Sequence, residues 1–304
     1  MHDQSLHKAV WQIPAGRWAL AVSGGADSVA LLRLVCEVPH VEWTVVHLNH
    51  QTRGRESDKD AEFVAELATS LKLKCAIARR DQIEPQLNDL SPNRSARFRA
   101  LRLAWFGSVV RQNQLSGVIL AHHADDQAET IFFRLLRGSH CRGLCGMSQR
   151  SRICGLVMLR PLLEIRRAIL RDYLKQIGRS WREDSSNLSP QYARNRIRTA
   201  LAGKDEVIEA LRDLGRSCAS LQRWVEKFSP PLPHEFPVAQ LARLPSILAE
   251  QSARRWLRER GVPVNELSPR VINDLIDMTA DAATPPRRDF PGSVHVRRRQ
   301  GIIA

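Results

Sequence analysis

The apolar positions of this chain change their period most sharply near its N-terminus. An apolar run from Trp18 to Val22 has the length of a buried strand, and apolar residues with helical spacing begin at Val29. Between them lies the sequence Ser-Gly-Gly-Ala-Asp-Ser, residues 23–28. The pattern predicts a strand, a glycine-rich turn and a helix, in that order.

The same two periods continue along the chain. Buried strands are expected at 41–48, 74–78 and 117–121, with helices at 56–73 and 91–113 between them. Further helices are expected at 165–177, 192–198, 206–228, 245–260 and 268–280, and a strand-like tail at 293–303. Alternating strands and helices favour an α/β fold, a Rossmann-like and mostly parallel sheet with flanking helices. A smaller, mainly helical second domain follows it.

Two breaks interrupt this pattern. Residues 138–155 are rich in Gly, Ser and Cys, which favours a flexible surface loop that closes over a substrate. A proline cluster at 229–233 is the clearest linker in the sequence. We expect one domain at 1–215 and a second at 216–304.

The charge of the chain is strongly positive. It has 46 lysines and arginines against 32 acidic residues, a formal net charge of +14, and only seven of these cations are lysines. Because arginine forks bind phosphate and stack on bases, an RNA partner is a natural interpretation. An arginine-rich codon bias in a basic protein is the alternative. The second domain is basic too, with 14 cations and nine acids from Arg216 onward.

The sequence gives no sign of membrane insertion or export. No apolar stretch approaches the roughly 20 residues of a membrane span. The first residues lack the charged-then-apolar layout of a signal peptide. We expect a cytoplasmic protein without a membrane partner, whose six cysteines are reduced.

The turn at 23–28 has the chemistry of a phosphate cradle. Gly24 and Gly25 let backbone N–H groups approach an anion without a Cβ clash, and the following helix adds its dipole. Ser23 and Ser28 add hydroxyl donors, and Asp27 either caps the helix or helps to hold magnesium. The spacing and the lysine of a Walker A loop are absent. An ordinary glycine-rich turn is the alternative.

Polar residues also follow the second strand and open the basic helix. His47 and Asn49 lie at the carboxyl end of a buried strand, where open α/β sheets bind ligands. Arg94 and Arg97 are three apart and share one face of the helix at 91–113. Few acids lie near them in the sequence, so phosphate contact is favoured over a solvated, acid-paired face.

The stretch 117–138 combines histidines with carboxylates. His122 and His123 follow a strand, and Asp125, Asp126 and Glu129 crowd the first turns of the next helix. The helix dipole explains one or two of these carboxylates, and pure capping is the alternative. Beside a phosphate loop, carboxylates suit magnesium–ATP or an amine substrate.

Two smaller groups complete the candidate chemistry. Arg194 and Arg198 lie four apart on one helical face with Asn195 beside them, an arrangement that suits a phosphate clamp. Cys141 and Cys145 are separated by three residues, and Cys154 follows them. This is not a compact CxxC motif, and no second pair follows, so unligated thiols are favoured over a metal or iron–sulfur site.

Four separated blocks, residues 23–28, 45–53, 120–139 and 182–198, resemble the tRNA(Ile)-lysidine synthetase family. The first is similar to the PP-loop of N-type ATP pyrophosphatases, which split ATP between its α- and β-phosphates. The blocks occur in the family's order and spacing. The resemblance is strong over residues 17–200 and weak beyond them.

The resemblance implies a ligase that uses ATP and Mg²⁺. Such enzymes adenylate the position-2 carbonyl oxygen of the wobble cytidine in an isoleucine tRNA with a CAU anticodon. The ε-amine of free L-lysine then displaces AMP, which gives lysidine. The domain at 1–215 would be a PP-loop catalytic domain and the one at 216–304 a tRNA-binding domain. A homodimer is a reasonable expectation by analogy.

The resemblance also implies roles for individual residues. ATP binding falls to Ser23, Gly24, Gly25, Ala26, Asp27, Ser28, His47, Asn49 and His122. Catalysis falls to Asp27, Asp126, Glu129, His123, Arg94 and Arg97, with Asp27 and Asp126 also holding the magnesium of Mg-ATP. The phosphate or tRNA clamp consists of Arg194, Asn195 and Arg198, and further tRNA contacts of Arg254, Arg255, Arg258 and Arg298.

Some residues depart from the family's pattern. An acid before the Arg-x-x-Arg pair is replaced by residues 90–93, which weakens the expectation for part of the lysine or ATP pocket. Phe98 stands where a tyrosine is usual, and His140-Cys141 replaces small or apolar residues. The chain ends at Ala304, as expected of a short form without a further C-terminal domain.

Three other functions stay open at this stage. A tRNA thiolase shares the PP-loop and the adenylated base but delivers sulfur, usually from a cysteine pair. A non-catalytic RNA-binding protein with a decayed nucleotide site would not need Asp27, Asp126 and Glu129. A small-molecule amide-forming PP-loop enzyme would not need so basic a second domain.

Overall fold

A computed structural model describes the chain except for residue 1 and residues 184–192. The chain forms two compact units, Met1–Gly215 and Arg216–Ala304. The boundary between them falls inside the long helix α10 (Asp205–Phe228).

The first unit is built on a six-stranded sheet with the order β3-β2-β1-β4-β6-β5. All neighbouring strands are parallel except the edge strand β5, which is antiparallel to β6. The strands are β1 (Gly16–Ala21), β2 (Val41–Asn49), β3 (Lys74–Arg79), β4 (Val118–Ile119), β5 (Arg150–Ile153) and β6 (Leu156–Leu159). The expected α/β fold with a mostly parallel sheet is confirmed.

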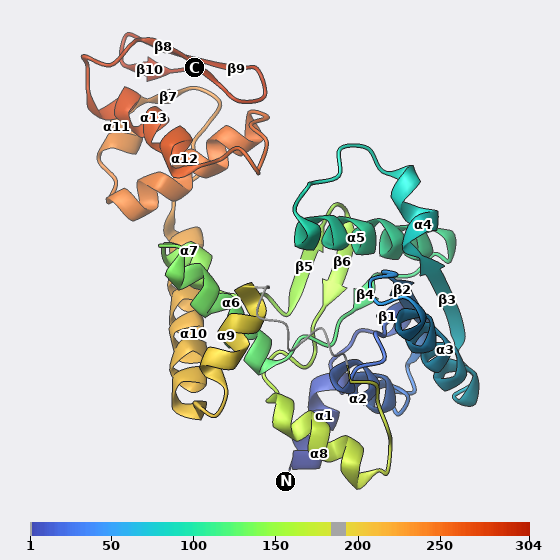
Figure 1. The fold of residues 1–304 in the computed structure, drawn as a ribbon. Coiled ribbons are helices and arrows are strands. Elements are labelled where there is room, and N and C mark those ends of the chain that lie inside the picture. The colour runs from blue at the N-terminus through green and yellow to red at the C-terminus, as the bar shows by residue number, and fades with distance from the viewer. Residues whose placement is uncertain (1, 184–192) are drawn as a thin grey trace. The chain divides into compact units, whose positions relative to one another are not determined.

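Alternation along the strands explains why helices cover both faces of this sheet. In β1 and just after it, Trp18, Leu20 and Val22 pack into one apolar cluster, and Ala19 packs into another. The first face is covered by α1 (His2–Trp11), α2 (Ala26–Val35), α3 (Arg55–Ser70) and α8 (Arg167–Gln176). The second is covered by α5 (Arg94–Gln112) (Figure 1). The sheet is therefore the middle of three layers.

The remaining elements of the first unit lie outside these layers. They are α4 (Arg80–Ile83), the 3-10 turn Glu84–Gln86, α6 (Ala124–Leu136), α7 (Cys141–Leu144) and α9 (Ala193–Leu201). Helix α9 packs beside α6 (Figure 1).

The structure differs from the sequence expectations in two places. Helix α1 was not expected at the N-terminus. Residues 138–155 are not one loop, because they contain α7 and the edge strand β5. The sequence of β5 (Arg-Ser-Arg-Ile) alternates with exposed arginines, so it lacks the continuous apolar run that marks the central strands.

The strand order fixes where a ligand can bind. The chain runs outward from β1 to β2 and β3, then returns to place β4 on the opposite side of β1. In open α/β sheets, the carboxyl edge at such a reversal is where ligands bind. The glycine turn at 23–28 follows β1, and His122 and His123 follow β4, so both stand at this edge.

The second unit packs a small antiparallel sheet on helices, and its mainly helical character is confirmed. The strand order is β7-β10-β9-β8. The strands are β7 (Phe236–Pro237), β8 (Arg287–Phe290), β9 (Val294–Arg299) and β10 (Ile302–Ile303); the helices are α11 (Val238–Ala242), α12 (Ser246–Glu259) and α13 (Pro269–Ala280). The tail expected as a strand is a hairpin, because Gln300 and Gly301 both have positive φ and form a tight turn.

The proline cluster at 229–233 packs within the second unit. Leu232 is buried in its apolar cluster. The carbonyl of Pro230 accepts a hydrogen bond from Ser252 at 2.8 Å, and that of Pro233 accepts one from Trp256 at 2.8 Å. The cluster is therefore tied to the second unit through Leu232 and two of its carbonyl groups, although Pro231 and Pro233 are exposed.

Candidate active site

The glycine turn at 23–28 is shaped by its two serines. The backbone N–H of Ser23 donates to Ser28 Oγ at 3.1 Å, and the two hydroxyl oxygens lie 3.1 Å apart. Ser28 Oγ donates to the carbonyl of Gly25 at 2.9 Å. Gly24 has a φ of +89°, a conformation that residues with a Cβ rarely adopt. These contacts hold the turn in one shape.

Helix α2 begins inside this turn, at Ala26, and its N-cap residue makes no side-chain cap hydrogen bond. The N-cap residue is Gly25, while Asp27 lies in the first turn. Of the two interpretations of Asp27, the capping role is therefore not realised. The first backbone N–H groups of a helix and its dipole favour an anion at this position.

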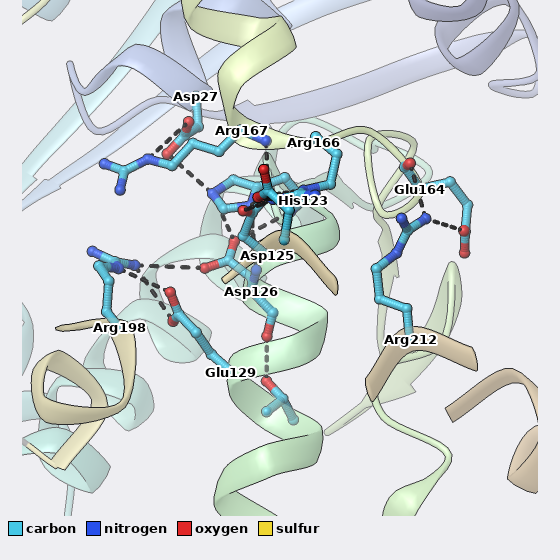
Figure 2. A network of polar contacts seen from close by, with 12 residues as sticks. Asp27, His123, Asp125, Asp126, Glu129, Glu164, Arg166, Arg167, Arg198 and Arg212 are labelled. Atoms are coloured by element: carbon cyan, nitrogen blue, oxygen red, sulfur yellow. Dashed lines mark hydrogen bonds and ion pairs between the residues drawn. The ribbon is translucent and has the colours of Figure 1, made fainter. Parts of the chain in front are cut away.

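Helix α6 carries its three carboxylates at the same edge of the sheet (Figure 2). His123 is the N-cap of this helix. Its Nδ1 accepts the backbone N–H of Asp126 at 3.3 Å, and the Asp126 carboxylate accepts the backbone N–H of His123 at 3.1 Å. Capping thus accounts for part of the position of Asp126, and it does not account for Glu129.

His123 is almost completely buried, with 1% of its surface exposed, and three aspartates lie around its ring. Its Nε2 lies 3.4 Å from Asp27 and 3.5 Å from Asp126, and its Nδ1 lies 3.7 Å from Asp125. Burial disfavours the charged ring, but the charges of Asp126 and Asp27 outweigh burial and raise the pKa of His123. The imidazole therefore joins the start of α2 to the start of α6.

Asp125 has a supporting role. Its carboxylate accepts the backbone N–H of Arg167 at 2.8 Å and lies 3.2 Å from the guanidinium of Arg166. Arg166 also pairs with Asp205 at 2.7 Å and with Glu209 at 3.3 Å, both in the first turns of α10. The contacts of Asp125 with Arg166 and Arg167 (Figure 2) fix the start of α6 against α8, and those of Arg166 with Asp205 and Glu209 extend this network to the start of α10.

The two predicted arginines of α9 pair with the predicted carboxylates of α6. Arg194 donates to Asp126 and to Glu129, both at 2.8 Å. Arg198 donates to Glu129 at 2.9 Å. Glu129 is 4% exposed, whereas the side chain of Arg194 is 51% exposed. The structure therefore brings the two predicted groups together, and each neutralises the other.

The larger of two cavities at this edge is polar, with a volume of about 380 Å³. Seven arginines line it: Arg53, Arg102, Arg167, Arg171, Arg182, Arg194 and Arg198. Its other polar or charged walls come from Ser23, Asp27, Asp60, His122, Asp126, Glu183 and Asn195, and it also touches Gly25 and Ala26. So many cations around a helix N-terminus suit a polyanion such as a triphosphate.

The second cavity, of about 270 Å³, is more apolar. Its apolar walls are Ala21, Val22, Val46, Leu48, Phe106, Leu120 and Ala121. It shares Ser23, Gly25, Asp27, Arg102 and His122 with the polar cavity. A mostly apolar cavity beside a phosphate cradle has the character of a nucleoside pocket.

Three histidines of this second cavity have a buried ring nitrogen with no hydrogen-bond partner in the described part of the chain. These atoms are His47 Nε2, His50 Nδ1 and His122 Nδ1. Burial lowers the pKa of His50 and of His122 to about 4, so both rings are neutral near pH 7. Neutral rings can exchange hydrogen bonds with a base or a ribose in the cavity.

Six of the expected site residues of the first unit line neither cavity. Gly24, His123 and Glu129 still adjoin residues that do, because Gly24 lies between Ser23 and Gly25, and His123 and Glu129 contact Asp126 or its partner Arg194. Three others have partners of their own. Arg97 pairs with Glu84, and Arg94 stacks over Phe98 with its guanidinium 5.3 Å from the ring centre. The Asn49 side chain bonds to Asp58 and to the backbone N–H of Gln51, which is a structural role. Arg94, Arg97 and Asn49 line neither cavity.

Arg102 is the residue of α5 that does reach the site, since it lines both cavities. Sequence reasoning missed it. A signal was present, because Arg99 and Arg102 form a second pair three residues apart on the same helix. Only the packing of α5 shows that Arg102, and none of the other three arginines of the two pairs, faces the cavities.

Asp60 and Arg182 were also missed, because they lie 122 positions apart in the sequence. Arg182 donates to Asp60 and to Glu56, both at 2.8 Å, and Asp60 pairs with Arg53 as well. The backbone N–H of Arg182 donates to the carbonyl of Gly24 at 3.0 Å. These contacts hold the segment before residue 184 against the glycine turn. The rest of its block, residues 184–192, lies outside the described residues.

The arginines expected to bind tRNA have different surroundings. Arg298 donates to the carbonyls of Met278, Asp281, Ala282 and Thr284, so it closes the C-terminal end of α13. Arg254 and Arg255 donate to the carbonyls of Leu267 and Glu226. Arg258 is exposed. A structural role for Arg298 replaces the predicted tRNA contact.

The carboxylates at the site fit a magnesium ion that comes with ATP. No group of three or more His, Cys, Asp or Glu side chains is arranged for a metal within the described residues. Magnesium usually takes only one or two carboxylates beside phosphate oxygens. Asp27 Oδ1 suits this, because it is buried and accepts no hydrogen bond from the described residues. Cys141, Cys145 and Cys154 line neither cavity.

Comparisons with known proteins agree with this geometry. The model of the PP-loop domain family matches residues 2–204. A tRNA(Ile)-lysidine synthase of Solibacter usitatus is 40% identical over 185 residues, which cover 61% of this chain and 40% of that protein. One of Rhodopirellula baltica is 36% identical over 194 residues, covering 58% and 49%. The chain thus matches less than half the length of these curated relatives.

A solved structure shares the fold. It is the U34-tRNA thiolase NcsA from Methanococcus maripaludis with its [4Fe-4S] cluster. The TM-score is 0.57 at 14% identity, with 72% of this chain and 78% of that chain covered. At this identity the likeness concerns the fold alone.

No described helix of the present chain has the length and apolarity needed to cross a membrane.

Proposed function

The chain belongs to the PP-loop domain family, which is ATP-binding, and on that premise we propose that it is a tRNA(Ile)-lysidine synthetase. It would use ATP to adenylate the wobble cytidine of an isoleucine tRNA with a CAU anticodon. It would then join free L-lysine to that base. The similarity to the two lysidine synthases supports this choice. The main structural support is the phosphate cradle of α2 directly beside the carboxylates of α6.

The first step would take place where the two cavities meet. The adenosine of ATP would occupy the apolar cavity. Its phosphates would extend over the N-terminus of α2 to the arginines that line the polar cavity. The position-2 oxygen of the cytidine attacks the α-phosphorus, and the bond to pyrophosphate breaks. Arg102, Arg167 and Arg182 line the polar cavity and would balance the charge that builds on the leaving pyrophosphate.

Magnesium would be held by Asp27 and Asp126 together with phosphate oxygens. When bound, the ion neutralises phosphate charge and so favours departure of pyrophosphate. His123 would keep both carboxylates in place, since its Nε2 lies 3.4 Å from Asp27 and 3.5 Å from Asp126.

The second step needs an anionic pocket for a cationic substrate. Glu129 and Asp126 are the buried carboxylates that suit the lysine ammonium, and they are paired with Arg194 and Arg198. Because Arg194 is half exposed, it can turn to phosphate and release its carboxylates to lysine. The ε-amine, once it has lost a proton, attacks C2 of the adenylated base, and AMP departs with the oxygen.

Sulfur transfer has less support as a second function. A thiolase needs reactive sulfur at the adenylated base, and none of the described cysteines lines either cavity. The likeness to the solved thiolase does not bear on this choice, because it reports the fold only.

The two steps can be tested separately. The full chain is mixed with ATP, magnesium and a CAU-anticodon isoleucine tRNA transcript, and pyrophosphate release is followed with and without labelled lysine. We expect pyrophosphate release without lysine and label in the tRNA only with it. Changing the wobble cytidine to uridine should abolish both signals. Pyrophosphate release without label would reject lysine transfer, and absence of both signals in protein that binds the tRNA would reject catalysis.

A further inference from the structure

The sheet of the second unit has one covered face and one bare face. Phe290, Val296 and Ile303 point inward and pack with the helices α11, α12 and α13. Residues on the alternate positions point outward and are exposed. We call these the outer sheet face; it consists of Arg287, Asp289, His295, Arg297, Arg299 and Ile302. In Figure 1 these strands lie along one side of the unit, with the helices on the other.

The register of the strands brings like charges together on this face. Arg287 of β8 stands directly opposite Arg297 of β9. Side chains at such positions are about 5 Å apart at Cβ, and like charges there are destabilising. Arg299 lies two residues along the same strand, about 7 Å away. The protein therefore keeps three guanidinium groups in a short row, although this arrangement costs free energy.

The one acid of the face offsets only part of this charge, because Asp289 interacts electrostatically with Arg287 but faces three arginines. Asp289 is the one acid of the outer sheet face and pairs with His295, whose Nδ1 lies 2.6 Å from its carboxylate. Arg297 and Arg299 have no side-chain acceptor or ion-pair partner among the described residues. An anionic partner would remove the repulsion between Arg287 and Arg297, and a guanidinium fork fits phosphate oxygens.

From this arrangement we propose that the outer sheet face binds the sugar–phosphate backbone of the tRNA, and this inference rests on the proposed function. The occupant is an RNA because the face is a cationic row whose exposed apolar residues are Ile302 and, beside it on the edge strand β7, Pro237. Such a face lacks the apolar centre of a protein interface. The match to the PP-loop family ends at residue 204, so this surface lies beyond it.

The three arginines proposed to contact RNA differ in role from Arg298, their neighbour in the sequence. Arg298 lies between Arg297 and Arg299 in the sequence, yet it points inward and closes α13. The run Arg297-Arg298-Arg299 is therefore two surface arginines around one structural arginine. Only the outward pair and Arg287 are free to meet phosphate.

The test compares two triple variants of the full chain. One carries Arg287→Gln, Arg297→Gln and Arg299→Gln, on the sheet. The matched control carries Arg223→Gln, Arg243→Gln and Arg270→Gln, exposed arginines on the helices or at a helix end of the same unit. Both variants lose three charges. Binding of the tRNA transcript is measured by fluorescence anisotropy at several salt concentrations, after melting curves confirm that both variants fold.

We expect the sheet variant to bind tRNA at least about tenfold more weakly than the parent chain. The slope of log K against log salt concentration should become less steep by about two to three units, one for each lost phosphate contact. The control should stay within about threefold of the parent chain, because its arginines make no shared phosphate track. A third variant with lysine at the three sheet positions should recover part of the affinity. Equal losses in the sheet and control variants would overturn the proposal.

The result of this RNA-binding test does not depend on whether the chain transfers lysine. If lysine transfer fails but the sheet variant still loses RNA affinity, the proposed function is wrong and this surface stands. If lysine transfer succeeds and the sheet variant binds tRNA like the parent, the surface proposal alone is wrong. A sheet variant that loses the parent's binding to vesicles of anionic lipid but keeps its binding to tRNA would also overturn the proposal.

Discussion

Asp27 connects the two halves of the site, because it lies in the first turn of α2 and contacts His123 of α6. We predict that Asp27→Asn lowers pyrophosphate release by about a hundredfold or more, since one charged group at a phosphoryl-transfer site is lost. The affinity for tRNA should change less than about twofold, because the variant keeps all the arginines proposed to contact the RNA backbone.

The control for this variant is Asp172→Asn, an exposed acid of α8 that pairs with Lys175. It should leave pyrophosphate release unchanged. An Asp27→Asn enzyme that keeps full activity would show that the carboxylate neither binds magnesium nor positions the phosphates.

The neutral histidines of the apolar cavity predict a pH dependence of stability. The folded pKa of His50 and His122 is about 4, and their pKa in the unfolded chain is about 6.5. Between these values the unfolded chain binds more protons, so the free energy of unfolding falls as the pH drops below about 6.5. Their contribution is complete above that pH.

A double variant with His50→Gln and His122→Gln should therefore lose less melting temperature than the parent chain between about pH 7 and pH 5. Differential scanning fluorimetry at both pH values measures this. An equal loss in both proteins would mean that the two rings are not held neutral in the folded state.

Arg298 gives a stability prediction in the second unit. Arg298→Ala leaves several carbonyl groups at the end of α13 without their cationic donor, and we expect a loss of about 2 kcal/mol in the free energy of unfolding. Arg258→Ala, on the exposed side of α12, should cost less than about 0.5 kcal/mol. Urea unfolding of the two variants compares them; similar values would remove the structural role of Arg298.

At the residue scale, prediction from the sequence works where the chemistry is contiguous. The glycine turn and the stretch from His122 to Glu129 each follow one strand, so the strand order brings them together without further information. Arg94 and Arg102 lie on the same helix, and the choice between them depends on how α5 packs, which no local pattern encodes. Asp60 and Arg182 meet only through the fold.

At the scale of elements, α6 and α9 supply the paired carboxylates and arginines that the proposed second step would have to separate. Their carboxylates and arginines satisfy each other, as Arg194 and Arg198 both bond to Glu129. We predict that Glu129→Gln raises the KM for lysine about tenfold or more, because a buried carboxylate no longer faces the ammonium. Pyrophosphate release in the absence of lysine should stay within about threefold, because it precedes lysine binding.

The matched control is Glu66→Gln, at an exposed position of α3. It should alter neither step. If Glu129→Gln abolishes pyrophosphate release and leaves the KM for lysine unchanged, the carboxylate serves the first step instead of the second.

The elements themselves were predictable to different degrees. Long helices with a clear apolar stripe, such as α10 and α12, lie within a few residues of their expected bounds. The strand β5 was missed because an exposed antiparallel edge strand has no continuous apolar run. The proline cluster at 229–233 marks the end of α10, yet its buried Leu232 ties it to the second unit.

At the scale of the whole molecule, the chain combines a PP-loop unit with a basic second unit. The sheet order and the helices on both faces place the phosphate cradle at a strand reversal. The net charge of +14 gives the chain an attraction for RNA, but charge alone does not say which face binds it. The proposed RNA-binding face rests instead on the register of β8 and β9, which sets Arg287 opposite Arg297.

The most direct test of lysidine synthesis is the mass of the wobble nucleoside. The full chain is incubated with ATP, magnesium, lysine and the CAU-anticodon isoleucine tRNA transcript, and the RNA is digested to nucleosides for mass spectrometry. We predict a cytidine heavier by one lysine less one water, absent when lysine or ATP is omitted. An unchanged cytidine, or one in which sulfur has replaced oxygen, from protein that binds the tRNA would contradict the account.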